Sequence, residues 1–405
     1  TEWVAFKDDK TQSEDAQTTR LITNADAEPS VIPQLETATV ATTNEDLPTA
    51  PETATSTPTP DAKAVNSSRI VLVRTDSLQL AIDLQGGDII ELALPRHLEK
   101  IDNPDIPFVL LEQNEKRTYI AQSGLIGSNG IDSTGRATFT TSSDSYEMAE
   151  GQENLVVELN WESDGDVKVT KRFTFTRGDY LIEVEYLVEN NSDSRWQANL
   201  FGQIKRDSTP APSSSDSGMG MQPFLGAAIT QPDERFTKFS FEDMQEEPFK
   251  AQLPGGWIAM LQHYFLSAWI PNKDQSHNYS TRVTSSGFNI AGFTSPALNL
   301  DPGQSGQTGA LFYAGPKDQY RLAEISPYLD LVVDYGWLWW IAQPLFWLLN
   351  KMFALVGNWG MAIILLTVLV KAAFFKLSAT SYRSMARMRK VQPKMMDIRE
   401  PVSYT

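Results

Sequence analysis

Hydrophobic and polar residues alternate along much of the chain between residues 69 and 316, as in "RIVLVRTDSLQLAIDLQGGDIIELAL", "NLVVELNW" and "VKVTKRFTFTRGDYLIEVEYLV". Period-two runs bounded by Gly, Asp and Asn predict β-strands. The stretch "FTRGDYLIEVEY" predicts a hairpin that turns at Gly178 and Asp179. A dozen or more such runs predict a mainly β fold, a large antiparallel sandwich of two sheets, in preference to a barrel.

Two stretches interrupt the alternation. The segment "DSTPAPSSSDSGMGMQP" at 207–223 predicts an exposed, mobile loop, and "PKDQYRLAEISPYL" at 316–329 predicts a short helix packed on the sandwich. Residues 69–330 are therefore predicted to form one β domain with a short helix at its end.

Residues 1–68 have a different composition. They are rich in Thr, Ala, Pro, Ser, Asp and Glu and have few large apolar side chains. Such a segment cannot bury enough apolar surface to offset the entropy of ordering its backbone. We interpret it as a disordered acidic tether between a membrane anchor and the β domain, with a passive tail as the alternative.

Residues 331–356 are dominated by tryptophan and aliphatic side chains. Because tryptophan favours the headgroup level of a bilayer, this segment predicts an amphipathic helix lying in the membrane interface. Pro344 is expected to kink the helix or to start it anew. The alternative is a buried core helix of the sandwich. The candidate interfacial residues are Trp337, Trp339, Trp340, Trp347 and, beyond the segment, Trp359.

The membrane-spanning helix has two possible registers. An uncharged stretch from Met352 to Val370 is about 28 Å long as a helix, just enough to cross the bilayer core, and it leaves Lys371 at the edge. The second register begins at Trp359 with Asn358 as N-cap and ends near Ser378. We prefer the second register, a single transmembrane helix within 357–380, since it places both the tryptophans and the arginines at interfaces.

In the preferred register Lys371 lies about 18 Å along the helix, inside the bilayer. An intramembrane charge costs roughly 2.5–3.5 kcal/mol on insertion scales, so it should face a polar cavity or a partner. Thr367 lies one helical turn earlier and shares that face. The alternative is that the Lys371 side chain reaches to the cytoplasmic headgroups.

Residues 381–405 predict a basic amphipathic helix at the cytoplasmic surface, held there by anionic lipids, or an ordinary basic flank that stops transfer. The candidate lipid contacts are Arg383, Arg387, Arg389 and Lys390.

Composition narrows the class of protein. The chain has 405 residues and no cysteine, which excludes disulfides, thiolate metal sites and thiol catalysis. Its formal net charge of −17 argues against a nucleic-acid-binding surface. Eight basic and two acidic residues follow from Lys371 onward, so the negative charge comes from the rest of the chain. The positive-inside rule then places the basic flank in the cytoplasm and the β domain in the periplasm.

The two ends of the chain suggest a fragment. It begins at Thr1 with no signal peptide, although a large exported domain needs an export signal or an earlier span, and it stops at "DIREPVSYT" without a closing element. We therefore expect an N-terminal span, and further elements after the basic helix, to belong to the whole protein.

The segment "DYGWLWWIAQPLFWLLNKMFALVGNWGMAIILLTVLVKAAFFKLSATSYRSMARMRKVQPKM" resembles the YidC/Oxa/Alb family of membrane protein insertases in its Gram-negative form. Upstream, "TDSLQLAIDLQGGDIIELALP", "GGWIAMLQHYF" and "PGQSGQTGALFYAGPKD" resemble the periplasmic domain of that family. The resemblance runs from about Arg69 to Arg399 and rests on long motifs.

The resemblance implies a periplasmic β-supersandwich between the first and second transmembrane helices of a multi-pass protein of the inner membrane. It implies a five-helix core around a hydrophilic groove, with a positive residue on the second transmembrane helix. Lys371 matches that position, where many members carry arginine, and keeps the charge without the planar fork. Thr367 matches a polar groove residue on the same helix.

The function that the resemblance implies is insertion and folding of nascent membrane proteins, alone or with the Sec translocon and its accessory subunits. It involves no enzymatic reaction, no metal and no cofactor. Because one helix cannot line a groove, the chain by itself is expected to be inactive.

Two rival hypotheses remain. The sandwich is also similar to mutarotase-like folds, so a membrane-anchored carbohydrate-binding module is an alternative. Sugar chemistry needs a converging acid and base, and the only histidines are His97 in a predicted loop, His263 in an apolar run and His277 in a polar turn. Each is interpreted as structural or solvated. The other hypothesis is a docking surface for partner proteins, with 207–250 as the region to test.

Overall fold

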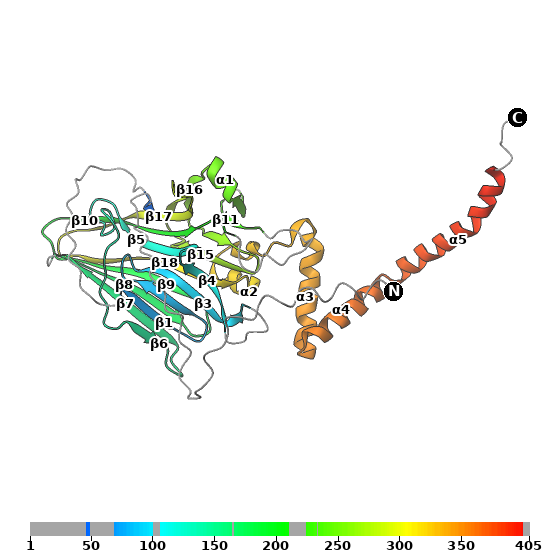
Figure 1. Ribbon diagram of the computed structural model, residues 1–405, viewed down its shortest axis with the longest axis horizontal. Coiled ribbons are helices and arrows are strands. Elements are labelled where there is room, and N and C mark those ends of the chain that lie inside the picture. Colours follow the sequence, from blue (N-terminus) through cyan, green and yellow to red (C-terminus); the bar gives the residue numbers. More distant parts are fainter. Residues whose placement is uncertain are drawn as a thin grey trace, which may run out of the picture. The chain divides into compact units, whose positions relative to one another are not determined.

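The computed structural model describes residues 46–48, 69–99, 106–163, 166–209, 224–232 and 234–399, without the side chains of residues 337, 390 and 392–399. Most of the predicted 1–68 tether and residues 210–223 of the predicted loop therefore lie outside the described residues. The described part consists mainly of β-strands followed by helices (Figure 1). The predicted fold class is confirmed, because the strands form two large sheets.

The first sheet has ten strands in the described part of the chain. Its neighbouring strands pair antiparallel, except that β1 and β6 are parallel. Its spatial order is β13 (Lys250–Pro254), β16 (Ser276–Val283), β17 (Asn289–Leu300), β10 (Trp196–Arg206), β5 (Thr118–Ile126), β4 (Pro107–Gln113), β3 (Asp88–Leu98), β2 (Gln79–Asp83), β1 (Ile70–Arg74) and β6 (Ser145–Glu147).

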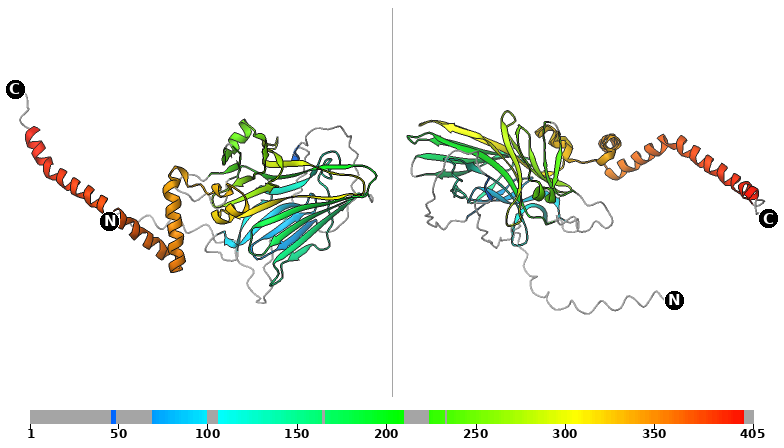
Figure 2. Two further views of the ribbon diagram at one scale, coloured as in Figure 1. Left: turned by 180° about the vertical axis from the view of Figure 1, so that it is seen from behind. Right: turned by 90° about the horizontal axis from the view of Figure 1, so that it is seen from above.

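The second sheet has eight described strands, all paired antiparallel. Its order is β12 (Thr237–Ser240), β11 (Gly226–Ile229), β14 (Ile258–Leu261), β15 (Phe265–Pro271), β18 (Ser305–Pro316), β9 (Leu181–Asn190), β8 (Val167–Thr176) and β7 (Asn154–Glu162). Figure 2 shows the ribbon with both sheets from behind and from above.

The hairpin predicted at "FTRGDYLIEVEY" is confirmed. Strands β8 and β9 pair antiparallel with Phe175 opposite Ile182, and the chain reverses between them at Gly178 and Asp179. Gly178 has a φ of +78°, which a residue without a Cβ adopts at little cost.

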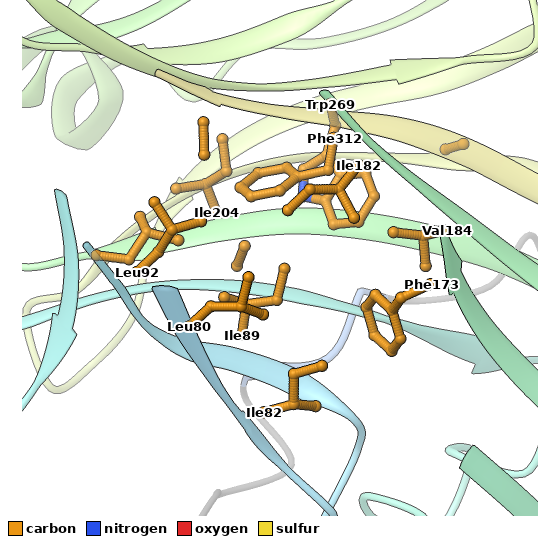
Figure 3. Packing of buried hydrophobic residues seen from close by; sticks show 14 of the residues in the cluster. Leu80, Ile82, Ile89, Leu92, Phe173, Ile182, Val184, Ile204, Trp269 and Phe312 are labelled. Atoms are coloured by element: carbon orange, nitrogen blue, oxygen red, sulfur yellow. The ribbon is translucent and has the colours of Figure 1, made fainter. Parts of the chain in front are cut away.

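The core lies between the inner faces of the two sheets, where the inward-facing apolar side chains of the strands pack together (Figure 3). Strand β8 shows the pattern clearly, since Val169, Phe173 and Phe175 are buried while alternate residues face outward. At the centre the rings of Trp269 and Phe312 lie 4.7 Å apart, with Ile182 beside them in Figure 3.

Two short helices accompany the second sheet. Helix α1 (Phe241–Glu246) begins with a capping box, in which Ser240 and Asp243 bond each other's backbone N–H. Helix α2 (Gln319–Ile325) lies in the stretch predicted to be helical, and Asp318 caps it. Its Leu322 packs in a cluster of buried side chains that includes Trp257 of the sandwich. Between α2 and the last helices lie the 3₁₀ turns η3 (Leu329–Val332) and η4 (Gly336–Leu338).

The C-terminal part consists of α3 (Trp339–Val356), α4 (Trp359–Ala373) and α5 (Phe375–Arg399). Helix α3 continues through Pro344, so the alternative that a new helix starts at this proline is wrong, and the kink there stays a prediction.

The prediction of one continuous helix from Trp359 to Ser378 is also wrong. The helix stops at Ala373, and α4 and α5 meet at an angle of 57°. At the break Phe374 has a ψ of 0°, and its N–H points to the carbonyls of both Val370 and Ala372, which tightens the turn. Among the described residues no single helix has both the length and the apolar composition for a membrane span, whereas α4 taken with α5 as far as Arg389 does.

The domain borders at 68, 330, 356 and 380 stay predictions. One detail departs from the predicted disordered tether: Asp46, within it, is buried and bonded to the first sheet.

Candidate functional site

The corner between α3 and α4 is built by two residues that suit it. Gly357 ends α3 with a φ of +66°, and its N–H bonds the carbonyl of Phe353. Asn358 then caps α4, since its side-chain oxygen accepts from the backbone N–H of Met361 at 3.1 Å. The predicted N-cap is thus confirmed. The rings of Phe353 and Trp359 stack across the corner with centroids 4.0 Å apart and planes at 11°.

Helix α4 exposes apolar side chains around most of its circumference. Ala362 is its only buried residue. An apolar surface of this extent needs lipid or other helices against it. The exposed large apolar residues of α4 are Trp359, Met361, Ile363, Ile364, Leu365, Val368 and Leu369.

Lys371 and Thr367 lie one helical turn apart on this apolar helix, and both are exposed. The hydroxyl of Thr367 donates to the carbonyl of Ile363 at 2.8 Å. The Thr367 oxygen is therefore left as an acceptor, while the Lys371 ammonium has three donors. The pair forms the polar stripe that the sequence predicted, and its role in a groove stays a prediction.

The tryptophans of α3 and the corner are largely exposed, as an interfacial helix requires. No side chain of α3 is buried, which argues against the alternative of a sandwich core helix. Lys351 lies over the ring of Trp347 at 5.8 Å. The side chain of Trp337 lies outside the described residues, and that residue precedes α3. Trp339 and Trp340 are each 60% exposed, Trp347 56% and Trp359 48%.

The basic candidates lie on α5. Arg383, Arg387 and Arg389 are exposed, and the side chain of Lys390 lies outside the described residues. Arg383 and Arg387 are one turn apart and lie on the same face, where like charges repel unless anions are near. Their contact with anionic lipid stays a prediction.

The histidines do not form an acid–base site. His97 lies in strand β3, not in a loop, and its Nε2 is 3.1 Å from the hydroxyl of Tyr180. His277 lies in β16, not in a polar turn, and it is fully buried. Burial lowers the pKa of His277, whose ring bonds the Ser295 hydroxyl and the Asn272 carbonyl. His263 is exposed in the turn between β14 and β15. These contacts fit the structural interpretation of the three residues.

A buried ionic cluster between the sheets escaped the sequence analysis. Arg136 bonds both Asp132, at 3.0 Å, and Asp88. The Nζ of Lys171, from β8, donates to the carbonyl of Gly87 at 2.8 Å. The signal in the sequence is Lys171 itself, a charged residue at an inward position of an alternating strand. We refer to Asp88, Asp132, Arg136 and Lys171 as the inter-sheet cluster.

Burial sets the protonation of this cluster. It lowers the pKa of Lys171 to about 7, an effect that Asp88 opposes. It raises the pKa of Asp88, against the pull of Arg136 and Lys171. Burial alone would lower the pKa of Arg136, but Asp132 and Asp88 outweigh it and raise that pKa. All four residues of the cluster are buried, so it is an ionic support inside the sandwich.

Comparison with known proteins covers both parts of the chain. Residues 70–348 match the model of the YidC periplasmic domain, and residues 351–403 match that of the 60Kd inner membrane protein. A protein of Cellvibrio japonicus named membrane protein insertase YidC is 51% identical over 359 residues, which cover 88% of this chain and 64% of that one.

Proteins of the same name from Stutzerimonas stutzeri and Pseudomonas aeruginosa are 51% and 46% identical, over 82% and 90% of this chain. The chain spans 60% and 67% of their lengths.

Among solved structures, a galactose mutarotase related enzyme from Lactobacillus acidophilus is 13% identical with a TM-score of 0.40, covering 60% of this chain and 97% of that one. A galactose mutarotase-like protein from Lactobacillus casei is 8% identical with a TM-score of 0.42, covering 60% and 99%. Likeness at this level supports no inference about carbohydrate binding.

Proposed function

Because the chain belongs to the YidC family of membrane protein insertases, we propose that it provides part of an insertase that assists nascent proteins into the bacterial inner membrane. The observation that carries this proposal is the exposed apolar surface of α4 with Lys371 and Thr367 on one face. The activity is one of binding and guidance, with no chemical reaction and no cofactor.

Helix length supports the proposal that Lys371 lies inside the membrane. Helix α4 has 15 residues, about 22 Å at roughly 1.5 Å per residue, which is shorter than a hydrocarbon core of about 30 Å. The span therefore includes the first turns of α5, and Lys371, near the end of α4, lies inside the core. A cation there costs roughly 2.5–3.5 kcal/mol unless a polar cavity or a partner receives it.

We propose that Lys371 and Thr367 face a hydrophilic groove which the other transmembrane helices of the whole protein complete. The ammonium group attracts acidic or polar segments of a substrate partway into the membrane, and the Thr367 oxygen accepts a hydrogen bond there. One helix lines only one wall, so this activity belongs to the whole protein.

The topology is proposed from charge and surface. Helix α3, with its exposed tryptophans, lies along the periplasmic interface. The sandwich is periplasmic, and the basic side of α5 lies at the cytoplasmic surface, near anionic lipid. The partners are nascent membrane proteins and the bilayer, and the Sec translocon with its accessory subunits is a further proposed partner.

The test uses a full-length insertase that carries this sequence, in a strain whose own insertase is depleted. Lys371→Arg is expected to support growth and Lys371→Ala to fail. Lys376→Ala is the matched control and should grow like the native protein, since Lys376 lies five residues further on, at the end of the proposed span, where its side chain reaches the headgroups. Equal growth with Lys371→Ala and Lys371→Arg, at equal protein levels, would show that Lys371 has no role in a groove and that its side chain only extends to the lipid headgroups.

A further inference from the structure

Asp46 is buried against the first sheet, although the sequence around it predicts disorder. The residue is 2% exposed and belongs to a short described segment, Asp46 to Pro48. Its carboxylate oxygen Oδ2 lies 2.6 Å from the Nζ of Lys205, and both side chains of this ion pair are almost fully buried. The ion pair joins positions 159 residues apart along the chain.

The backbone of Asp46 is recognised as well as its side chain. Gln203 Nε2 donates to the Asp46 carbonyl at 2.6 Å, and Arg282 donates to the same oxygen at 2.8 Å. Arg282 also donates to the side-chain oxygen of Gln203 at 2.9 Å. Two donors thus converge on one carbonyl, while a cation meets the carboxylate.

The register of the sheet brings these side chains together. Lys205 in β10 and Arg282 in β16 both pair with Ile290 in β17, the strand that lies between them, so they point from the same face. Two residues further along β17, on the same face, is Gly292, which lies opposite Gln203. A Cβ at Gly292 would come within 2.6 Å of the Gln203 Cβ. The missing side chain leaves room for Arg282 to reach Gln203 across β17.

The site is also bonded to a neighbouring strand, because Gln203 in β10 pairs with Gln122 in β5 and their side chains lie on the same face of the first sheet. Gln203 Nε2 also donates to the side-chain oxygen of Gln122 at 3.0 Å, and Gln122 donates to Asp88 of the inter-sheet cluster at 2.9 Å. The Nζ of Lys205 lies 4.4 Å from the centroid of the Phe288 ring. Burial lowers the pKa of Arg282 to about 10, an effect that Asp46 opposes. A buried and a partly buried cation on one sheet face are costly unless an anion lies between them.

We propose that Lys205, Gln203 and Arg282 form a docking site for an acidic residue and its backbone carbonyl, and that its occupant is the tether of the same chain at Asp46. The docked segment attaches the tether to the middle of the first sheet. In the sheet order β5, β4, β3 and β2 lie between β10 and β1, where the domain begins. At about 4.8 Å per strand the two points are about 24 Å apart.

The length of the chain permits this contact. Twenty-three residue steps separate Asp46 from Arg69, and even a fraction of their extended reach of about 3.3–3.6 Å per residue spans such a distance. A short linker holds the acidic residue at a local concentration in the millimolar range, so a contact that is weak between separate molecules is occupied within one chain. The site is independent of Lys371 and of insertion activity.

The first experiment is a zero-length crosslink on the full chain in detergent. A carbodiimide joins carboxylates to amines that are already in contact, and we expect an amide between Asp46 and Lys205 in the peptide mass map. Asp46→Asn and Lys205→Arg should each remove it. The exposed pair Lys168 and Glu162, at 3.3 Å, is the internal control. Coupling of Lys205 to Glu45 or another carboxylate as strongly as to Asp46, while the control pair reacts, would overturn the proposal.

The second experiment measures binding of the tether segment when it is added as a separate peptide. A fluorescent peptide of residues 42–50 is titrated by anisotropy against the full-length Asp46→Ala chain, whose site is vacated. We expect the peptide to bind the Asp46→Ala chain weakly. It should bind the native chain at least tenfold more weakly still, because the tether of that chain competes for the site. Binding to the Asp46→Ala chain should be at least tenfold weaker when the peptide carries Asp46→Asn. Binding of the native peptide should be weakened as much when the Asp46→Ala chain also carries Lys205→Arg and Arg282→Gln. Equal binding by the native and Asp46→Ala chains would contradict docking in this site.

Discussion

The Nζ of Lys171 lies 2.8 Å from the carbonyl oxygen of Gly87, so a basic side chain of the second sheet ends against a turn of the first. The same nitrogen donates to the carbonyls of Gly86 at 3.0 Å and Ser123 at 3.2 Å. Three backbone oxygens thus use all three donors of one ammonium group. The contact links the two sheets by hydrogen bonds beside the buried ion pairs of Arg136.

Lys171→Met is expected to remove a pH dependence of stability. The pKa of Lys171 falls to about 7 in the fold from an ordinary 10.5, so the unfolded chain binds more protons between these values. Stability should then rise with pH across that window, by up to about 1.4 kcal/mol per unit. Urea unfolding of the chain in mild detergent between pH 7 and 10 measures the slope. Lys168→Met, at an exposed position of the same strand, should keep it, and an unchanged slope in Lys171→Met would refute the assignment.

Arg136→Ala is expected to destabilise the sandwich by about 3–5 kcal/mol. The change leaves the carboxylates of Asp88 and Asp132 buried without their shared cation. Arg172→Ala, which removes a half-exposed ion pair with Glu158, should cost at most about 1 kcal/mol. Urea midpoints of the two variants provide the comparison. A loss below 1 kcal/mol for Arg136→Ala would mean that the cluster relaxes or admits water.

Gly202→Ala tests the packing beneath strand β10. A Cβ at this position would lie 2.5 Å from Cε1 of Phe293 and 2.9 Å from Cδ2 of Trp269. Overpacking a filled core costs typically 1–3 kcal/mol, and these rings are held by neighbours on both sheets. The exposed residue of the same strand, Gln197, supplies the control Gln197→Ala, expected within about 0.5 kcal/mol. Thermal unfolding followed by tryptophan fluorescence distinguishes them, and equal midpoints would contradict the predicted clash.

Asn358→Ala is expected to fray the start of α4. The change removes the acceptor for the Met361 N–H and costs about 1 kcal/mol of helix stability, whereas Asn358→Ser keeps a cap. Hydrogen exchange in micelles should show faster exchange of the first-turn amides in the Ala variant alone. Unchanged protection would mean that the stacked rings of Phe353 and Trp359 hold the corner without the cap.

Local patterns in the sequence were sufficient for much of the fold. Alternation predicted the strands, the Gly178-Asp179 pair predicted the β8–β9 hairpin, and Asn358 predicted the start of α4. Each of these features depends on residues within a few positions of one another. The break at Phe374 was not predictable in this way, because no proline or glycine marks it and the residues around it suit a continuous helix.

Only the tertiary structure shows which residues far apart in the sequence are in contact. The sequence alone determined that the chain has a long alternating β region, a tryptophan-rich helix and a lysine within an apolar helix. It did not show that Lys171 reaches Gly87, or that Asp46 meets Lys205 159 residues away. Such partners are chosen by the order and register of strands in the two sheets. That order minimises the free energy of the whole sandwich, and no local run of residues contains it.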